Sequence, residues 1–313
     1  MLSYNLKKRN ERVNFLKQEN KKIKVALLSI ISNSALIILK IIAGILSGSV
    51  SIISEAIHSG MDLVASIIAF FSVKISAKPA DQDHPYGHGK VENVSGVVEG
   101  LLIFIAALVI IVEAVKKIIM PTEIQGTTVA IGVMIFSAIV NFVVSKKLYK
   151  VAKEEDSIAL EADALHLKTD IYTSLGVGLG LLLIKLTNLY ILDPIVAILV
   201  ALLIINEAWH LSSKAFSPLL DAKLSNEEEA KVKGILDKYK SQILDYHMLR
   251  TRKAGSTKYI DFHMTVQDKL TVKESHDLSE KIEADIEDSL KNTSVNIHIE
   301  PGSIEDAEKD KNA

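Results

Sequence analysis

The amino-acid sequence predicts an α-helical membrane protein in which six transmembrane helices are followed by a small soluble α/β domain. Two observations lead to this prediction. Hydrophobic residues make up 49% of the 313 residues, but they crowd between about residue 25 and residue 210. The last hundred residues are charged and show the periodicity of short soluble helices and strands. This asymmetry is typical of a membrane domain joined to a soluble one.

The spans follow from the length of the apolar segments, because a helix needs about twenty apolar residues to cross a bilayer. Six segments approach or exceed this length: Val25–Leu46, Val50–Val73, Val94–Val115, Thr128–Val144, Ala159–Leu186 and Ile191–Ala208. A tight turn at Ser47–Ser49 joins the first two. The fourth is the shortest, and an alternative start near Ile124 would lengthen it.

The positive charges predict the orientation. An even number of spans places both termini on one side of the membrane, and loops rich in lysine and arginine favour the cytoplasm. One set of loops holds the basic N-terminal segment, Lys74, Lys78, Lys90 and the lysines within 146–153, whereas the opposite loops hold Lys116, Lys117 and Lys185. We therefore expect a multi-pass protein of the inner (cytoplasmic) cell membrane with both termini in the cytoplasm. The cytoplasmic segment 1–24 is expected to lie on anionic lipid rather than to bind nucleic acid.

The soluble part begins near Ser225, where the hydrophobic period changes. The expected elements are a helix over Asn226–Lys240, strands over Ile243–Arg252 and Lys258–Gln267, a helix over Val272–Leu290 and a strand over Ser294–Ile299. Gly255 marks the hairpin between the first two strands. This αββαβ order predicts an open-faced sandwich of the ferredoxin-like or metallochaperone-like kind. The expected domains are 25–215 for the membrane, 216–305 for the cytoplasmic part, and a disordered tail over 306–313.

Two pairs of ionisable residues inside the spans point to metal chemistry. Such residues are costly in a bilayer and usually mark an ion or proton path. His58 and Asp62 are four residues apart and share one helix face, and His166 and Asp170 repeat the spacing in the fifth span. Together they offer two imidazole nitrogens and two carboxylate oxygens, a tetrahedral set suited to Zn2+. A structural His–Asp hydrogen bond would explain one pair, but the repetition favours the metal site.

Other features of the spans are given weaker interpretations. Lys40 is expected to snorkel or pair locally, and Glu55 and Asn141 to pack or to form hydrogen bonds. Glu99 and Glu113 are placed near span ends, where they would reach the interface. The chain has no cysteine, which excludes disulfides and thiolate metal sites. Because the unperturbed histidine pKa is about 6.5, protons should compete with the metal, which suggests exchange of metal for protons.

Several segments resemble the cation diffusion facilitator family, especially its bacterial zinc and ferrous-iron efflux pumps. They are GSVSIISEAIHSGMDL, PADQDHPYGHGKVE, EADALHLKTDIYTS, LDPIVAILVALLI, LRTRKAG and VNIHIEPGS, and the similarity runs from about Lys22 to Pro301. The resemblance implies a homodimer that exports divalent metal from the cytoplasm in exchange for protons by alternating access. It places the transport site on His58, Asp62, His166 and Asp170. Many relatives have Asp where this chain has His58, and His is usual in zinc-selective members.

The resemblance also implies two further metal sites. One consists of Asp81, His84 and His88 in the loop after the second span, although such residues could simply be solvated. The other consists of His247, His263, His276, His298 and Glu300, with Glu300 in place of an Asp that bridges two ions. In relatives, residues at the positions of Lys90 and Asp221 form an inter-subunit charge interlock. His210 belongs to none of these groups and is interpreted as an interfacial residue.

The residues themselves predict part of the soluble cluster. If Gly255 centres the hairpin, residues whose numbers sum to 510 face each other, so His247 lies opposite His263. His298 and Glu300 are two apart and share a strand face. Scattered surface histidines are the alternative interpretation.

The expected cargo is Zn2+, and also Cd2+, with Zn2+ in addition bound as a regulator and with no organic cofactor. Efflux of Fe2+, Mn2+ or Co2+ by the same mechanism is the alternative. A membrane metallohydrolase would need an open coordination position and a general base, and no H-E-x-x-H pattern is present. A metal sensor would need an output domain, which the sequence does not resemble. We therefore expect a transporter and not an enzyme, whose partners are a second copy of the chain, divalent ions, protons and the lipid bilayer.

Overall fold

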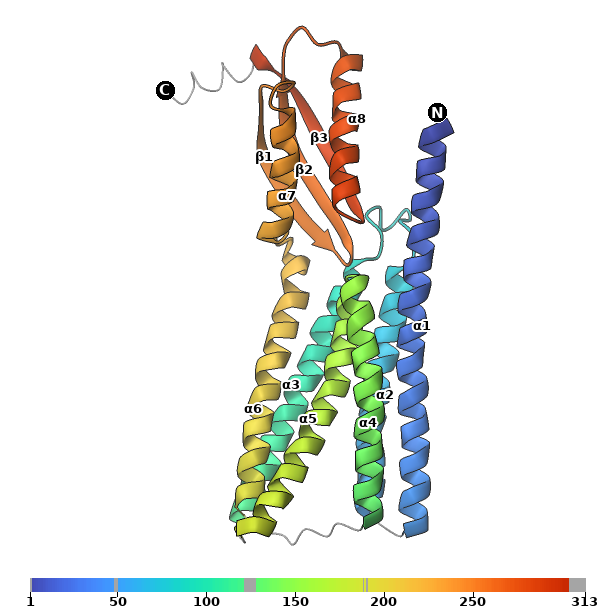
Figure 1. Cartoon of the computed structure of the whole chain (residues 1–313), viewed down its shortest axis with the longest axis vertical. Coiled ribbons are helices and arrows are strands. Elements are labelled where there is room, and N and C mark those ends of the chain that lie inside the picture. Colours follow the sequence, from blue (N-terminus) through green and yellow to red (C-terminus); the bar gives the residue numbers. More distant parts are fainter. Residues whose placement is uncertain (1, 48–49, 121–127, 188, 190, 304–313) are drawn as a thin grey trace. The chain divides into compact units, whose positions relative to one another are not determined.

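The computed structural model describes residues 2–47, 50–120, 128–187, 189 and 191–303 (Figure 1). Within these ranges only the backbone is described for residues 2–18, 47, 50–55, 57–58, 61, 128–131, 177–185 and 193. The turn at Ser47–Ser49, the alternative start near Ile124, the side chain of Glu55 and the expected tail over 306–313 therefore lie wholly or partly outside the described residues. The chain divides into two compact units, Met1–Phe216 and Ser217–Ala313.

The first unit is a bundle of long helices (Figure 1). They are α1 (Leu2–Ser47), α2 (Val50–Ser76), α3 (Lys90–Ile119), α4 (Thr128–Glu154), α5 (Ile158–Thr187) and α6 (Leu192–Phe216). Each predicted span corresponds to one of these helices. Helix α1 is continuous from Leu2, so the helix has no break at residue 24. Among the described residues, four segments are long and apolar enough to cross a membrane: Glu19–Leu46, Lys90–Ile119, Gly132–Glu154 and Pro194–Leu220.

Many small residues are buried inside the bundle, and many large apolar residues are exposed on its outside. Alanines such as Ala65, Ala159 and Ala201 are fully buried, whereas Leu46, Leu101 and Leu203 are largely exposed. Helices α3 and α6 approach so closely that a Cβ on Gly100 would lie 2.2 Å from the Ser212 Oγ. Small residues allow such close packing in membranes, where apolar side chains can face lipid.

A buried ionic network joins the helices at the end of the bundle where α3 begins. Lys22 of α1 places its Nζ 2.6 Å from Glu19 and 3.0 Å from Glu92 of α3. Glu92 also accepts hydrogen bonds from Ser76 at the end of α2 and from Ser157, which precedes α5. Both Glu92 oxygens are therefore satisfied within the protein, and the network fixes the end of α2 relative to α3 and α5.

The second unit has the predicted αββαβ order. Its elements are α7 (Asn226–Leu236), β1 (Asp245–Ala254), β2 (Thr257–Val266), α8 (Val272–Ser289) and β3 (Thr293–Pro301), with 3-10 turns at Ser217–Leu220 and Asp237–Tyr239. Capping boxes at Ser225 and Thr271 start the two helices. The sheet order is β1-β2-β3, with β2 antiparallel to β1 and parallel to β3.

The sheet has one face packed against the helices. Ile260, Phe262 and Met264 of β2 are buried in one core with Leu236 of α7 and Ile282 of α8. Because side chains alternate along a strand, His263 lies on the opposite face. There it is part-exposed and can meet its neighbours on β1 and β3.

Candidate metal sites

Helices α2 and α5 bring together two of the four predicted intramembrane ligands. Asp62 is buried on α2, and its Oδ1 lies 3.0 Å from the Nε2 of His166 on α5. Asp170, one turn further along α5, accepts a 3.2 Å hydrogen bond from the Nδ2 of Asn141 on α4. His58 lies one turn before Asp62 on α2, but its side chain is outside the described residues. The structure thus brings Asp62 and His166 together, and the metal site of all four residues stays a prediction.

The surroundings of this pair suit a polar ligand. The Nδ1 of His166 is buried and has no hydrogen bond to a described residue. A buried ring nitrogen without a partner is unusual and indicates a place for water or an ion. Asn33 of α1 donates to the Asp62 carbonyl oxygen at 3.5 Å and to the Ser66 Oγ at 2.8 Å. Ser66 in turn donates to the Asp163 Oδ1 at 2.8 Å, so α1, α2 and α5 are tied together beside the pair.

The expectation for Glu99 was wrong. Instead of reaching the interface it is fully buried, and its Oε1 accepts a 2.9 Å hydrogen bond from Ser95. Helix α3 begins at Lys90, before the predicted span, so Glu99 lies deeper than expected, on a face that packs against other helices. Asp163 is also fully buried, and sequence reasoning missed it. The signal was present, because Asp163 lies three residues before His166 in an apolar span and therefore near it on the helix surface.

Three other polar residues of the spans, Lys40, Asn141 and His210, lie in surroundings that agree with their expected roles. The Nζ of Lys40 is buried on α1 and donates to the Ser59 Oγ at 2.6 Å, which is a local pairing. Asn141 is buried and forms the hydrogen bond to Asp170 described above. His210 is exposed on α6 and joins none of the groups of possible ligands.

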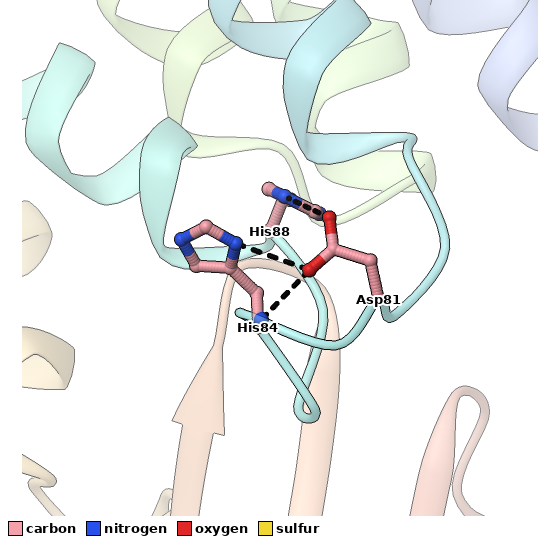
Figure 2. A group of neighbouring side chains, drawn as sticks. All are labelled: Asp81, His84 and His88. Atoms are coloured by element: carbon pink, nitrogen blue, oxygen red, sulfur yellow. Dashed lines mark hydrogen bonds and ion pairs between the residues drawn. The ribbon is translucent and has the colours of Figure 1, made fainter.

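The loop between α2 and α3 gathers Asp81, His84 and His88 around one carboxylate (Figure 2). The Asp81 Oδ1 lies 3.2 Å from the His84 Nδ1, and its Oδ2 lies 3.3 Å from the His88 Nε2. One ligand atom of each residue lies within 4.8 Å of the others, so the three residues could share one ion. The backbone N–H of His84 donates to Asp81 at 2.7 Å, and this bond is the main cause that lowers the pKa of the Asp81 carboxyl. The Asp81 carboxyl is therefore anionic at neutral pH, as a metal ligand would have to be.

The strand register assembles the soluble cluster. His247 pairs with His263, as predicted, and His263 pairs with His298 on the other side. The register that produces the His247–His263 pair differs from the predicted one. Near the turn, paired residues such as Ala254 and Thr257 have numbers that sum to 511, so the turn is centred between Gly255 and Ser256. An irregularity between His247 and Arg250, with Met248 at a φ of 52°, restores the predicted pair.

Glu300 connects the three histidines of this face. Its Oε1 lies 2.8 Å from the His263 Nδ1 and 3.7 Å from the His298 Nε2, and its Oε2 lies 3.2 Å from the His247 Nε2. Ligand atoms of His247, His263 and Glu300 lie within 4.8 Å of one another. His276 does not join them within the protomer. It lies on α8, which packs on the other face of the sheet, and its Nε2 is 3.4 Å from Glu280.

The predicted charge interlock of Lys90 and Asp221 would join two copies of the chain. Within the soluble unit, Asp221 has a positive φ of 54° and its Oδ1 lies 3.4 Å from the Arg252 Nη1. Lys90 is the first residue of α3. Whether they meet across a dimer stays a prediction.

Two family models together match most of the chain. One, described as a cation efflux transmembrane domain, matches residues 26–220, and the other, described as the cytoplasmic domain of cation efflux proteins, matches residues 224–302. The chain belongs to the cation diffusion facilitator family. The resemblance predicted from the sequence is confirmed, and with it a helical transmembrane domain followed by a cytoplasmic domain with a small mixed sheet. Family members are transporters, not enzymes, and the match to this cytoplasmic domain indicates dimerisation.

Relatives in the family align along nearly their full lengths. The uncharacterized transporter sll1263 of Synechocystis sp. is 36% identical over 276 residues, which are 88% of this chain and 89% of the relative. The manganese efflux system protein MneP of Bacillus subtilis is 30% identical over 289 residues, 89% and 95% of the two chains. The cation-efflux pump FieF of Shewanella oneidensis is 28% identical over 277 residues, 88% and 93%. The chain is therefore a cation efflux transporter, and the relatives' names do not agree on one metal.

Proposed function

We propose that this transporter exports Zn2+, and also Cd2+, from the cytoplasm in exchange for protons, by alternating access in a homodimer. The observation that carries the proposal is the 3.0 Å contact between Asp62 of α2 and His166 of α5. An imidazole and a carboxylate from two different helices form half of a tetrahedral ligand set, and His58 and Asp170 lie one turn away on the same helices. Relative movement of α2 and α5 would open or close such a site.

Proton exchange follows from the chemistry of these donors. Imidazole and carboxylate bind a metal only after they have lost their protons, so metal binding displaces protons and metal release takes them up again. Because the site opens to one side of the membrane at a time, metal and protons then move across the membrane in opposite directions. The orphaned His166 Nδ1 supports a site that receives a ligand in another state of the cycle.

The choice of zinc rests on donor type. A site with two imidazoles suits Zn2+, whereas oxygen-rich sites suit Mn2+, and His58 is the position that decides between them. Manganese efflux is the second candidate, because a 30% identical relative is named for it. Replacement of His58 by Asp is expected to move the preference from zinc towards manganese or iron.

The other features complete the proposal. All six helices of the first unit span the inner membrane with both termini in the cytoplasm, as the positive charges predict. The loop group and the soluble histidine cluster bind Zn2+ from the cytoplasm and support or regulate transport. Lys90 and Asp221 link the two protomers.

Metal uptake into proteoliposomes tests the proposal. Purified protein is reconstituted, and Zn2+, Cd2+, Fe2+, Mn2+ and Co2+ compete for transport in the wild type, Asp62→Asn and His58→Asp. Glu113→Gln serves as a control, because Glu113 is an exposed acid on α3. We expect zinc and cadmium flux in the wild type and the control, and loss of flux in Asp62→Asn. A wild type that moves manganese in preference to zinc would refute the choice of metal, and one that moves none of these ions would refute the transport of all five.

A further inference from the structure

Two buried carboxyl groups lie in the bundle outside the predicted ligand set. Asp163 of α5 and Glu99 of α3 are each 0% exposed. One oxygen of each accepts a hydrogen bond from a serine, Ser66 for Asp163 and Ser95 for Glu99. The other oxygen of each, the Asp163 Oδ2 and the Glu99 Oε2, is buried without a hydrogen-bond partner among the described residues. The two carboxyl groups also interact electrostatically.

These groups differ from Glu92, another acid that is buried in the bundle. Glu92 has Lys22 as a counter-ion and three hydrogen bonds that satisfy both of its oxygens. In the described part of the chain, neither Asp163 nor Glu99 forms an ion pair with a lysine or arginine. An isolated carboxylate in an apolar medium is very unfavourable, and the group takes up a proton instead. Two neighbouring carboxylates would repel each other as well, so a proton on one of them would relieve both costs.

The position of Asp163 connects it with the transport site. It lies three residues before His166 on α5, and Ser66, which donates to it, lies one turn after Asp62 on α2. Helices α2, α3 and α5 pack against one another (Figure 1). The charged or titratable groups that act on Asp163 are His166 on its own helix, Asp62 of α2 and Glu99 of α3. The polar groups around it are Ser66 and, from α1, Ser29 and Asn33.

We propose that Asp163 and Glu99 form a proton-binding site, distinct from the metal ligands, that carries part of the counter-transported protons. The inference rests on the proton exchange of the proposed function. A divalent ion at Asp62 and His166 adds positive charge beside Asp163, which favours the carboxylate and expels its proton to water. When the metal leaves, the carboxylate loses that neighbour and takes up a proton from the side then open. One metal ion thereby drives the movement of a proton that none of its own ligands holds.

The first experiment measures the protons moved for each zinc ion. Wild type, Asp163→Asn, Glu99→Gln and the double variant are reconstituted, and Zn2+ flux and internal pH are recorded with entrapped fluorescent indicators. Because the proposed metal ligands are intact, Zn2+–Zn2+ exchange should stay near the wild-type rate. The number of protons per zinc ion should fall to about half or less in the double variant, since its carboxyls no longer titrate. Asp163→Glu, which keeps an acid, should restore coupling, and Glu113→Gln should not change it.

The second experiment detects the bound proton without transport. Dicyclohexylcarbodiimide adds to protonated carboxyl groups in apolar surroundings, and mass spectrometry locates the adduct. We expect labelling at Glu99 or Asp163 in the full-length protein. Zn2+ and raised pH should reduce this labelling. In Asp62→Asn, Zn2+ should no longer reduce it.

The outcomes separate this inference from the proposed function. A double variant that exchanges zinc and keeps the wild-type number of protons per zinc ion would overturn the inference and leave antiport intact. A wild type that transports zinc with no proton movement would overturn proton exchange, and the inference with it. Labelling of neither carboxyl at any pH would also overturn the inference.

Discussion

Asn141 provides a sharp test of how the transport site is held. Its Nδ2 donates to the Asp170 Oδ2 at 3.2 Å, and its Oδ1 has no hydrogen bond to a described residue. Asn141→Leu keeps the side-chain size and removes this one bond. A hydrogen bond to a charged group contributes about 1.5–3 kcal/mol, and 3.2 Å is at the long end of the usual range, so the lower half applies. At about 1.4 kcal/mol for each factor of ten, zinc affinity should fall roughly 10- to 40-fold.

The assay is the zinc concentration that gives half-maximal flux in proteoliposomes, with zinc affinity in detergent measured by calorimetry. Ser137→Ala is the matched control. Ser137 lies one turn before Asn141 on α4 and is also buried, but its Oγ has no hydrogen bond to a described residue. An Asn141→Leu protein with wild-type affinity, or a Ser137→Ala protein with an equal loss, would refute the idea that Asn141 orients Asp170.

Three further predictions concern stability and the soluble cluster. Lys22→Met leaves Glu92 buried without its counter-ion, which should cost about 3–5 kcal/mol and lower the melting temperature in detergent by roughly 6–20 °C; an unchanged melting curve would contradict the role of the network. Gly100→Ala should destabilise the bundle, because its Cβ would lie 2.2 Å from the Ser212 Oγ, and Ser212→Ala should restore part of the loss in the same melting assay. His263→Ala should reduce the zinc bound per protomer, measured by equilibrium dialysis, while transport persists; complete loss of flux would mean that the cluster is essential.

The sequence predicted where helices and strands lie along the chain better than which side of each element is buried. The change of hydrophobic period near Ser225 and the glycine of the hairpin are local signals, and they placed all three strands and both helices of the soluble unit to within a few residues. The pair His247–His263 was also predicted. The prediction centred the turn on Gly255, half a residue too early, and the irregularity near Met248 shifts the register back to the predicted pair. Such an irregularity depends on packing across the sheet, which no single strand encodes.

The failures in the membrane unit have one physical cause. Hydropathy measures how apolar a segment is along its length, but burial depends on which way each residue faces around the helix. Glu99 was judged from its distance to a span end, and Asp163 was not singled out beside the stronger His166 pattern. Their environments depend on neighbours contributed by other helices, such as Ser66 of α2, and those neighbours are known only once the helices are packed.

The cost of burying a charge applies to four buried acids of the bundle, and they differ in the group that neutralises them. Glu92 has a lysine of the protein as its counter-ion, and its contacts hold α1, α2, α3 and α5 together. Asp62 faces an imidazole that can exchange its proton for a metal ion from solution. In the part of the chain that the structure describes, Asp163 and Glu99 pair with no lysine or arginine and lack a full set of hydrogen-bond donors, and the cation proposed to neutralise them is a proton. If metal and proton are held by different carboxyls, replacing Asp163 should uncouple the two flows, whereas replacing Asp62 should stop both.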